Sequence, residues 1–392
     1  MTKLGSVITQ VRGVSYSPKD LHDSLNDESI ILLRANNIKD GKINFDDVVY
    51  VDKKKVNKNQ YINYGDILIC TSSGSKELVG KAAFFTDNTI ATFGAFCKVI
   101  RPSIPCKEFI GHFFNSPFYR KKISSLSSGA NINNIRNEHI DNLEINLPTE
   151  NIQEAITLRL NLVNSLIESR QTQLSKLDHL VKSRFVEMFG DVYLNTMSWD
   201  EKSLESIADI VSGITKGRKI KNKHLKEVPY MSVSNVKDGY IDWSTVKTID
   251  ATDKEIDQYR LLQDDILITE GGDPDKVGRG AIIKTPLENC IHQNHIFRVR
   301  LNESIILPVF FAEYLQHQKS KRYFLGCAKQ TTGIASINMK QLKSLPVLIP
   351  PIELQQEFTN FIQQVDKAKS SVKQSLEKLE TLKKSLMQEY FG

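Results

Sequence analysis

The segment LPTENIQEAITLRLNLVNSLIESRQTQLSKLDHLVKSRFVEMFG, from Leu147 to Gly190, has one proline near its start and one glycine, at its end. A helix typically begins after proline and ends at glycine. Apolar residues recur between them in steps of four and three, the spacing of a coiled-coil seam, with Arg170 at one polar position. They are Ile156, Leu160, Val163, Ile167, Leu174, Leu177, Val181 and Met188. This pattern predicts one long helix.

A second segment with the same pattern follows Pro350 and Pro351 and ends at Gly392. Its apolar series is Leu354, Phe358, Phe361, Val365, Ala368, Val372, Leu379, Leu382 and Leu386. Each helix would be about 50–60 Å long, and an apolar stripe of that length needs a partner. Because related repeats favour self-complementary packing about a twofold axis, we expect the two helices to form an antiparallel coiled coil.

The rest of the chain also occurs twice. NIKDGKINF, from Asn37 to Phe45, returns as NVKDGYIDW, from Asn235 to Trp243, and DILI at 66–69 returns at 265–268. The other matches, in order along the chain, join Gly13 to Gly213, Gly80 to Gly278, Ser128–Gly129 to Thr332–Gly333, and Phe189–Gly190 to Phe391–Gly392. A period of about 200 residues is too long for a solenoid, so the sequence predicts two copies of one domain.

Each copy mixes short β-rich runs, such as 66–70 and 96–100, with turn signals and a helical piece expected over Glu108–Leu126. The predicted fold is α+β: two repeated mixed α/β domains separated by two long helices. The predicted boundaries are 1–147 for the first domain and 148–190 for the first helix, then 191–349 for the second domain and 350–392 for the second helix.

The composition is that of an ordinary globular protein: 392 residues, 40% hydrophobic and 25% charged, with a net charge of +6. This charge permits nucleic-acid binding but does not require it. The five cysteines are scattered without a C-x-x-C pair, so we expect reduced thiols. No apolar run reaches the roughly 18 residues of a membrane span, and no signal-peptide pattern opens the chain, so we expect a cytoplasmic protein.

No catalytic pattern stands out in either copy. The segment Gly74–Ala82 departs from a phosphate-binding loop, since five residues separate its glycines and Ala82 replaces the Ser or Thr that would hold magnesium. His292 and His295 have no third metal ligand at a recognisable spacing. We therefore predict no catalytic residue, no metal site and no cofactor in this chain.

Basic residues concentrate in loops and recur at equivalent places in the two copies. Cations at loop tips neutralise DNA phosphates, and arginine also binds guanine. The candidates are Lys76, Lys81, Arg120, Lys121, Lys216, Arg218, Lys219, Lys221, Lys276 and Arg279. A solvated charged turn remains an alternative explanation for the run at 216–223.

A second group of candidates combines glycine with hydroxyl, amide or basic side chains. Glycine allows close approach of the backbone to a ligand, and Gln or Asn can bind adenine. The candidates are Ser128 and Gly129 in the first copy, and Lys329, Thr331, Thr332 and Gly333 in the second. An ordinary turn before the next strand explains these segments equally well.

Two divergent domains, each followed by a long helix, resemble the specificity subunit of type I restriction-modification systems. The helices begin with LPTENIQE or IPPIELQQE and end with FVEMFGD or LMQEYFG, and TTGIASIN at 331–338 adds to the likeness. In the first copy the last motif is degenerate, SSGANINN from Ser127.

The resemblance implies that each domain recognises one half of a bipartite, asymmetric double-stranded DNA target and that the helices are conserved spacers. It also implies a non-catalytic subunit. Two methyltransferase subunits would dock on the helices and carry S-adenosylmethionine, and two motor-nuclease subunits would use ATP and Mg. A coiled-coil adaptor that binds protein or RNA is the alternative, and salt-insensitive, sequence-independent binding would favour it. A stand-alone methyltransferase-nuclease lacks a supporting cofactor motif.

Overall fold

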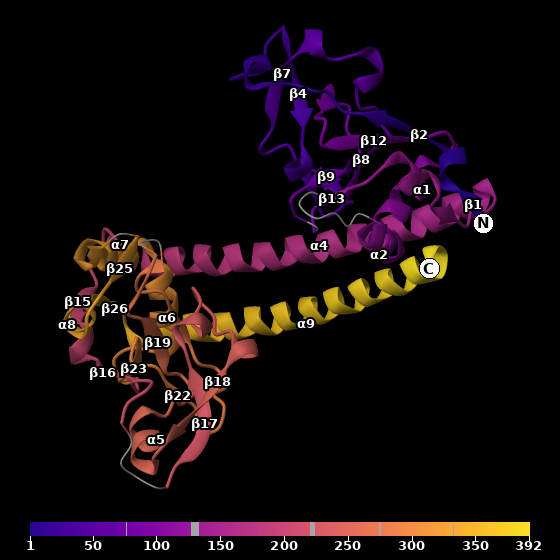
Figure 1. The fold of residues 1–392 in the computed structure, drawn as a ribbon. Helices are drawn as coiled ribbons and strands as arrows, with labels where there is room; N and C mark the ends of the chain where they lie inside the picture. The colour runs from indigo at the N-terminus through magenta and orange to yellow at the C-terminus, as the bar shows by residue number, and fades with distance from the viewer. Residues whose placement is uncertain (76, 127–132, 220–223, 274–275, 332) are drawn as a thin grey trace. The chain divides into compact units, whose positions relative to one another are not determined.

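A computed structural model describes residues 1–75, 77–126, 133–219, 224–273, 276–331 and 333–392 (Figure 1). The chain forms two compact units. Unit 1 comprises Met1–Thr172 and Lys373–Gly392, and unit 2 comprises Gln173–Val372. Among the described residues, no helix is both long enough and apolar enough to cross a membrane.

Unit 1 is built on two four-stranded sheets. The first sheet is antiparallel and runs in the order β10 (Ala82–Phe84), β8 (Ile67–Cys70), β12 (Cys97–Pro102) and β2 (Ile8–Arg12). The second sheet runs in the order β11 (Ala91–Phe93), β4 (Ser29–Leu33), β7 (Val49–Asp52) and β3 (Leu21–His22). Two-stranded pairs complete the unit: β1 (Thr2–Lys3) with β14 (Glu144–Ile145), β5 (Ile38–Lys39) with β6 (Lys42–Ile43), and β9 (Ser72–Ser73) with β13 (Asn133–Asn134).

Unit 2 repeats the first sheet of unit 1. Its order is β16 (Ala208–Ser212), β23 (Ile296–Leu301), β19 (Ile266–Thr269) and β21 (Gly280–Ile282). The other sheets are β18 (Lys247–Ala251), β17 (Lys226–Met231) and β22 (Ile291–His292); β20 (Gly271–Gly272), β25 (Ile334–Ser336) and β24 (Lys329–Thr331); and β15 (Asp200–Ser203) with β26 (Pro346–Ile349). Its short helices are α5 (Asp253–Tyr259), α6 (Pro308–Gln316), α7 (Gln318–Cys327) and α8 (Met339–Lys343).

The repeat extends to close backbone contacts. A Cβ atom on Gly13 would lie 2.1 Å from the carbonyl oxygen of Gly94, and one on Gly213 would lie 2.0 Å from that of His292. Both glycines follow equivalent strands, so the matched glycines of the sequence mark the same tight approach. The turn signal at Asp40–Gly41 is also confirmed, because both residues have positive φ values, 49° and 80°, between β5 and β6.

The two long helices are α4 (Glu150–Phe189) and α9 (Ile352–Phe391). In unit 1, Leu160 near the start of α4 shares a core with Phe391 at the end of α9. In unit 2, the ring of Phe185 near the end of α4 lies 5.4 Å from that of Phe358 near the start of α9. Within each unit the start of one helix therefore packs against the end of the other, which confirms the antiparallel pairing and the α+β fold.

One predicted helix is divided in the structure. Instead of one helix over Glu108–Leu126, α1 (Lys107–Phe114) and α2 (Pro117–Leu126) are separated by Asn115 and Ser116. A proline lacks the N–H of a helical hydrogen bond and disfavours helical geometry in the residue before it, but it is well tolerated in the first turn. Pro117 therefore ends one helix and begins the next. A five-residue helix, α3 (Asn137–Asp141), follows in the same unit.

Candidate nucleic-acid interface

Several loops of unit 1 meet at one end of its first sheet. The carbonyl oxygen of Phe96 accepts hydrogen bonds from the backbone N–H groups of Thr71 (2.9 Å) and Ser72 (3.2 Å). The N–H of Ile135 donates to the carbonyl of Thr71 (2.9 Å), and β9 pairs with β13 (Figure 1). We call the described residues 71–75, 77–81, 94–97 and 133–135 the first loop end.

Unit 2 builds the same arrangement. The N–H of Glu270 donates to the carbonyl of His295 (3.0 Å), and the N–H of Ile337 donates to the carbonyl of Glu270 (2.8 Å). Here β20 pairs with β25 of the β24–β25 hairpin. We call the described residues 270–273, 276–279, 293–296, 329–331 and 333–337 the second loop end. Each copy thus presents the same set of loops.

Six of the predicted binding residues lie at these loop ends, Thr331 among them. Lys81 and Lys329 are exposed to solvent, as phosphate-binding cations must be. Gly333 has a φ of +80° at the tip of the β24–β25 hairpin, where no atom lies within 4 Å of a Cβ position. Lys276 forms an ion pair with Asp273. Arg279 is partly buried and donates from Nη2 to the carbonyl of Val233 (3.4 Å).

Arg120 supports a loop of the first loop end from α2. Its guanidinium donates to the backbone carbonyls of Val79 (2.9 Å) and Glu77 (3.0 Å). These contacts hold the residues just before Lys81 in place. Lys121, the next predicted residue, is exposed on α2. Of this predicted basic pair, Arg120 therefore stabilises the loop, and Lys121 is accessible to a ligand.

The basic run after β16 divides in the same way. Arg218 donates to both carboxylate oxygens of Glu255, from Nε (2.6 Å) and Nη2 (2.8 Å), and to the carbonyl of Asp250 (3.0 Å). The hydrogen bonds from Arg218 are the largest cause that lowers the pKa of Glu255, to about 2. Arg218 therefore joins this loop to α5, whereas Lys216 and Lys219 remain exposed.

The run also begins beside the second loop end. The N–H of Ile214 donates to the carbonyl of His292 (2.8 Å), and the N–H of Asn294 donates to the carbonyl of Ile214 (3.0 Å). Lys216 follows two residues later. Lys216 and Lys219 therefore place two exposed cations beside the second loop end.

Some predicted residues lie outside the described part of the chain. They are Lys76, Ser128, Gly129, Lys221 and Thr332. Of Thr331 only the backbone is described, where it pairs with Ile334 in the β24–β25 hairpin.

Two residues that the loop ends expose were not among the predicted DNA-binding residues. Phe96 is 71% exposed, and His295 occupies the equivalent turn of the second copy. Phe96 was expected only to begin the β-rich run 96–100. Its position 199 residues before His295, the same separation as between Asp66 and Asp265, was the available signal.

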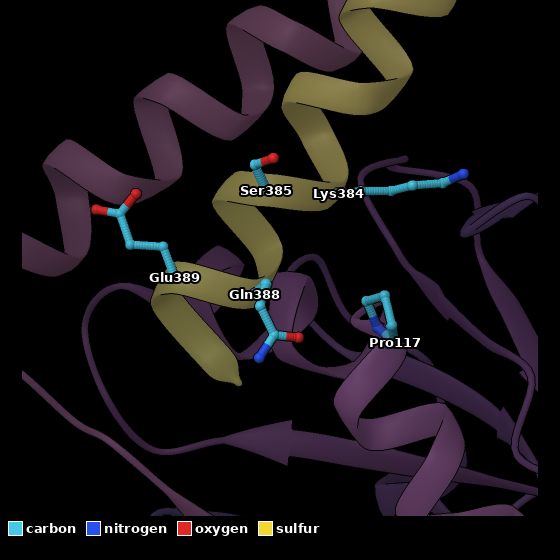
Figure 2. A pocket seen from close by; sticks show the side chains of 5 residues that line it. All are labelled: Pro117, Lys384, Ser385, Gln388 and Glu389. Carbon is cyan, nitrogen blue, oxygen red and sulfur yellow. The ribbon is translucent and has the colours of Figure 1, made fainter.

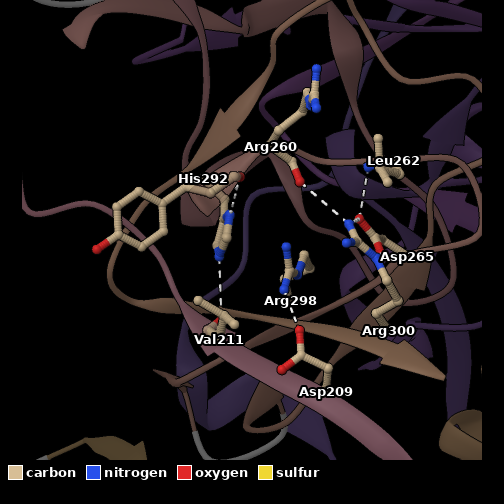
Figure 3. Close-up of polar contacts among 9 residues, drawn as sticks. Asp209, Val211, Arg260, Leu262, Asp265, His292, Arg298 and Arg300 are labelled. Atoms are coloured by element: carbon tan, nitrogen blue, oxygen red, sulfur yellow. Dashed lines mark hydrogen bonds and ion pairs between the residues drawn. The ribbon is translucent and has the colours of Figure 1, made fainter. Parts of the chain in front are cut away.

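The two histidines considered for a metal site have different surroundings, and Figure 3 shows those of His292. His292 is fully buried, with Nδ1 3.0 Å from the carbonyl oxygen of Tyr259 and Nε2 3.3 Å from that of Val211. Burial is the main cause that lowers its pKa to about 4, so this ring stays neutral at pH 7. His295 is exposed and pairs with Glu270. No group of three potential metal ligands occurs among the residues that the structure describes.

Two open hollows lie along α9. In unit 1, Pro117 of α2 faces the last turns of α9 (Figure 2). The lining residues are Pro117, Lys384, Ser385, Gln388 and Glu389. In unit 2 the first turns of α9 provide Ile352, Glu353, Gln356, Glu357 and Asn360. Both hollows lie on α9 and are distinct from the loop ends.

Comparison with known proteins assigns both copies to one family. The model of the type I restriction modification DNA specificity domain matches residues 2–179 and again residues 197–381. The chain is 30% identical over 407 residues to the StySPI specificity subunit of Salmonella potsdam and 29% identical over 405 residues to the EcoKI specificity subunit of Escherichia coli K12. Each alignment covers 99% of this chain and 87% of the relative.

Solved structures show the same fold. The S subunit of the M. genitalium type I restriction-modification system matches with a TM-score of 0.56 and 15% identity, covering 100% of this chain and 95% of that one. A chain from a structure on complex assembly and conformational transition of the type I R-M system matches with a TM-score of 0.58 and 17% identity, covering 100% and 99%.

Proposed function

Because the chain belongs to the type I restriction modification DNA specificity family, we propose that it recognises a bipartite, asymmetric double-stranded DNA target. Residues 1–147 and 191–349 are the two target-recognition domains of this proposal. The observation that carries it is the loop end built twice on the same backbone hydrogen bonds with different side chains. Equal scaffolds with unequal side chains favour two half-sites of different sequence.

The exposed cations supply the sequence-independent part of binding. Lys81 and Lys121 in unit 1, and Lys216, Lys219 and Lys329 in unit 2, are exposed at or beside the loop ends. Lysine side chains in such places bind phosphates and position a protein on the duplex, whereas contacts to base edges provide sequence specificity. Arg120 and Arg218 act in this proposal by holding the loops.

The helices set the distance between the half-sites in this proposal. Residues 148–190 and 350–392 are the spacers, and each contains a 40-residue helix, about 60 Å long. We expect helices of this length to hold the two half-sites at a fixed gap, on the scale of one duplex turn, about 34 Å.

Catalysis belongs to partner subunits in this proposal. Two methyltransferase subunits dock on the helices and provide S-adenosylmethionine, and two motor-nuclease subunits provide ATP and Mg, in the cytoplasm. Leu158, Leu162 and Leu166 support docking, because they form an exposed apolar row at four-residue spacing on α4. This chain itself is non-catalytic in the proposal and directs adenine methylation by position alone.

Methylome sequencing tests the proposal. A host would express this chain with and without its methyltransferase subunit, and adenine methylation would be mapped at base resolution. We expect a new bipartite, asymmetric motif only when both proteins are present. A soluble, assembled complex that methylates no new motif would contradict the proposal. Salt-insensitive, sequence-independent binding by that complex would favour the adaptor alternative.

A further inference from the structure

We propose that Phe96 and the Glu270–His295 pair are equivalent base-recognition elements with different chemistry. Phe96 makes apolar contact with a base of the first half-site, and Glu270 with His295 hydrogen-bonds to a base edge of the second. The inference rests on the proposed function and names the residues that make the half-sites different.

The two positions are equivalent by their hydrogen bonds. The carbonyl of Phe96 accepts from the N–H that follows β8, and the carbonyl of His295 accepts from the N–H that follows β19. Each turn closes on itself in the same way. The N–H of Cys97 donates to the carbonyl of Gly94 (2.8 Å), and the N–H of Ile296 donates to that of Gln293 (2.9 Å).

Both turns are fixed from several sides. The N–H of Gly94 donates to the carbonyl of Leu33 (2.9 Å), and the N–H of Gln293 donates to that of Met231 (3.0 Å). A side chain on a turn held by strands is presented with a defined direction, as base recognition requires. The backbone hydrogen bonds of the two turns therefore fix the positions of residues 96 and 295.

The side chains at these two equivalent positions differ in chemistry. Phe96 exposes a large apolar ring, the type of group that packs on a thymine methyl or wedges between base steps. One exposed apolar side chain is common on protein surfaces, so exposure alone decides nothing. The position matters because Phe96 lies at the first loop end, with Lys81 and the hydroxyl-bearing strand β9.

The second loop end offers hydrogen-bonding groups instead. Nδ1 of His295 pairs with a carboxylate oxygen of Glu270, and both side chains remain accessible to solvent. A carboxylate accepts from the N4 amino group of cytosine, and an imidazole N–H donates to the acceptors of guanine. Adenine presents the same combination, its N6 amino donor beside its N7 acceptor, so a pair of this kind fits a base edge that offers a donor next to an acceptor.

The experiment uses the full chain in complex with its methyltransferase subunit. The variants are Phe96→Ala and His295→Ala, and the matched control is Ile90→Ala. Ile90 is 70% exposed and lies before β11, whereas Phe96 lies after it. The readouts are the methylated motif and binding to duplexes with single base changes in either half-site. Thermal melting checks that each variant folds as the wild type does.

We expect Phe96→Ala to lose discrimination, on the order of tenfold, at one or two positions of the first half-site only. His295→Ala should do the same in the second half-site only, and Ile90→Ala should change neither. Unchanged discrimination in both variants, with a wild-type complex that methylates a bipartite motif, would overturn this inference alone. A wild-type complex without any such motif would overturn the proposed function and this inference with it.

Discussion

Arg300 donates two hydrogen bonds to the buried carboxylate of Asp265, from Nε at 2.7 Å and from Nη2 at 2.8 Å. The same carboxylate accepts the N–H of Leu262 (2.7 Å). In the first copy, Arg101 and Asp66 form the same paired contact, with distances of 3.0 and 2.8 Å. The aspartate that opens each DILI motif is therefore a structural residue, which fastens β8 to β12 and β19 to β23.

Replacing Asp265 by Ala should destabilise unit 2. The substitution leaves Arg300 without its partner and one backbone N–H without its acceptor, so we expect a loss of about 2–3 kcal/mol in the free energy of unfolding. Chemical denaturation measures this loss. The matched control is Asp253→Ala, whose ion pair with Lys226 is exposed to solvent and should contribute far less to stability. Equal losses for the two variants would contradict the structural role of Asp265.

The Glu255–Arg218 ion pair should make stability sensitive to acid. Because the pKa of Glu255 is lower in the folded protein than in the unfolded chain, its stabilising contribution is complete above pH 5. That contribution is lost as the pH falls from about 5 to about 2. We expect Glu255→Gln to be less stable than the wild type at pH 7 and to lose less stability over that range.

Thermal melting between pH 7 and pH 2 provides the measurement. Asp250→Asn is a suitable control, because only the backbone carbonyl of this residue contacts Arg218. If the melting temperatures of the wild type and of Glu255→Gln fell equally between pH 7 and pH 2, this ion pair would contribute nothing to acid sensitivity.

Lys329→Ala should weaken DNA binding without changing its sequence preference. Removal of one phosphate contact lowers affinity similarly for all sequences and reduces the slope of log K against log salt by about 1. Binding titrations at several salt concentrations, with the complex used for the methylome, give this slope. Lys202→Ala in β15 is the control, because this exposed lysine lies on a strand pair outside the second loop end. A change in preferred bases would assign Lys329 to base recognition instead.

Arg120→Ala should behave differently from Lys81→Ala. Because Arg120 binds the carbonyls of Glu77 and Val79, its loss releases two acceptors and loosens the loop that carries Lys81. We expect reduced protection of this loop in hydrogen exchange, together with weaker binding at the first half-site. Lys81→Ala should weaken binding with no change in protection. Identical exchange in both variants would remove the bracing role of Arg120.

The helices could be predicted from sequence because their signals are local. Pro148, Gly190 and the apolar steps between them need no partner to be recognised, and Gly190 adopts the expected positive φ of 71°. The roles of Arg120 and Arg218 could not be predicted from sequence. Their hydrogen-bond acceptors are distant in the sequence and come close to the two arginines only in the folded unit. Phe96 was missed for a related reason. A turn that projects its side chain outward has the same local composition as the start of a strand.

Lengthening both spacer helices should widen the gap between the half-sites. Unit 1 and unit 2 divide α4 between Thr172 and Gln173 and divide α9 between Val372 and Lys373, so insertions at both points leave each unit intact. Seven residues per helix make about two turns, which preserves the apolar seam, and add about 10 Å, close to three base pairs of duplex. We expect a methylated motif with both half-sequences unchanged and a gap about three base pairs longer.

The control inserts seven residues into α4 alone. That change displaces one side of the antiparallel seam against the other, so we expect lower thermal stability and loss of bipartite methylation, not a longer gap. A gap that stays unchanged in the matched double insertion, with both half-sites still methylated, would show that the helices do not measure the distance. The spacing would then have to be set by the partner subunits, because rigid helices of greater length cannot hold two bound domains at the original separation.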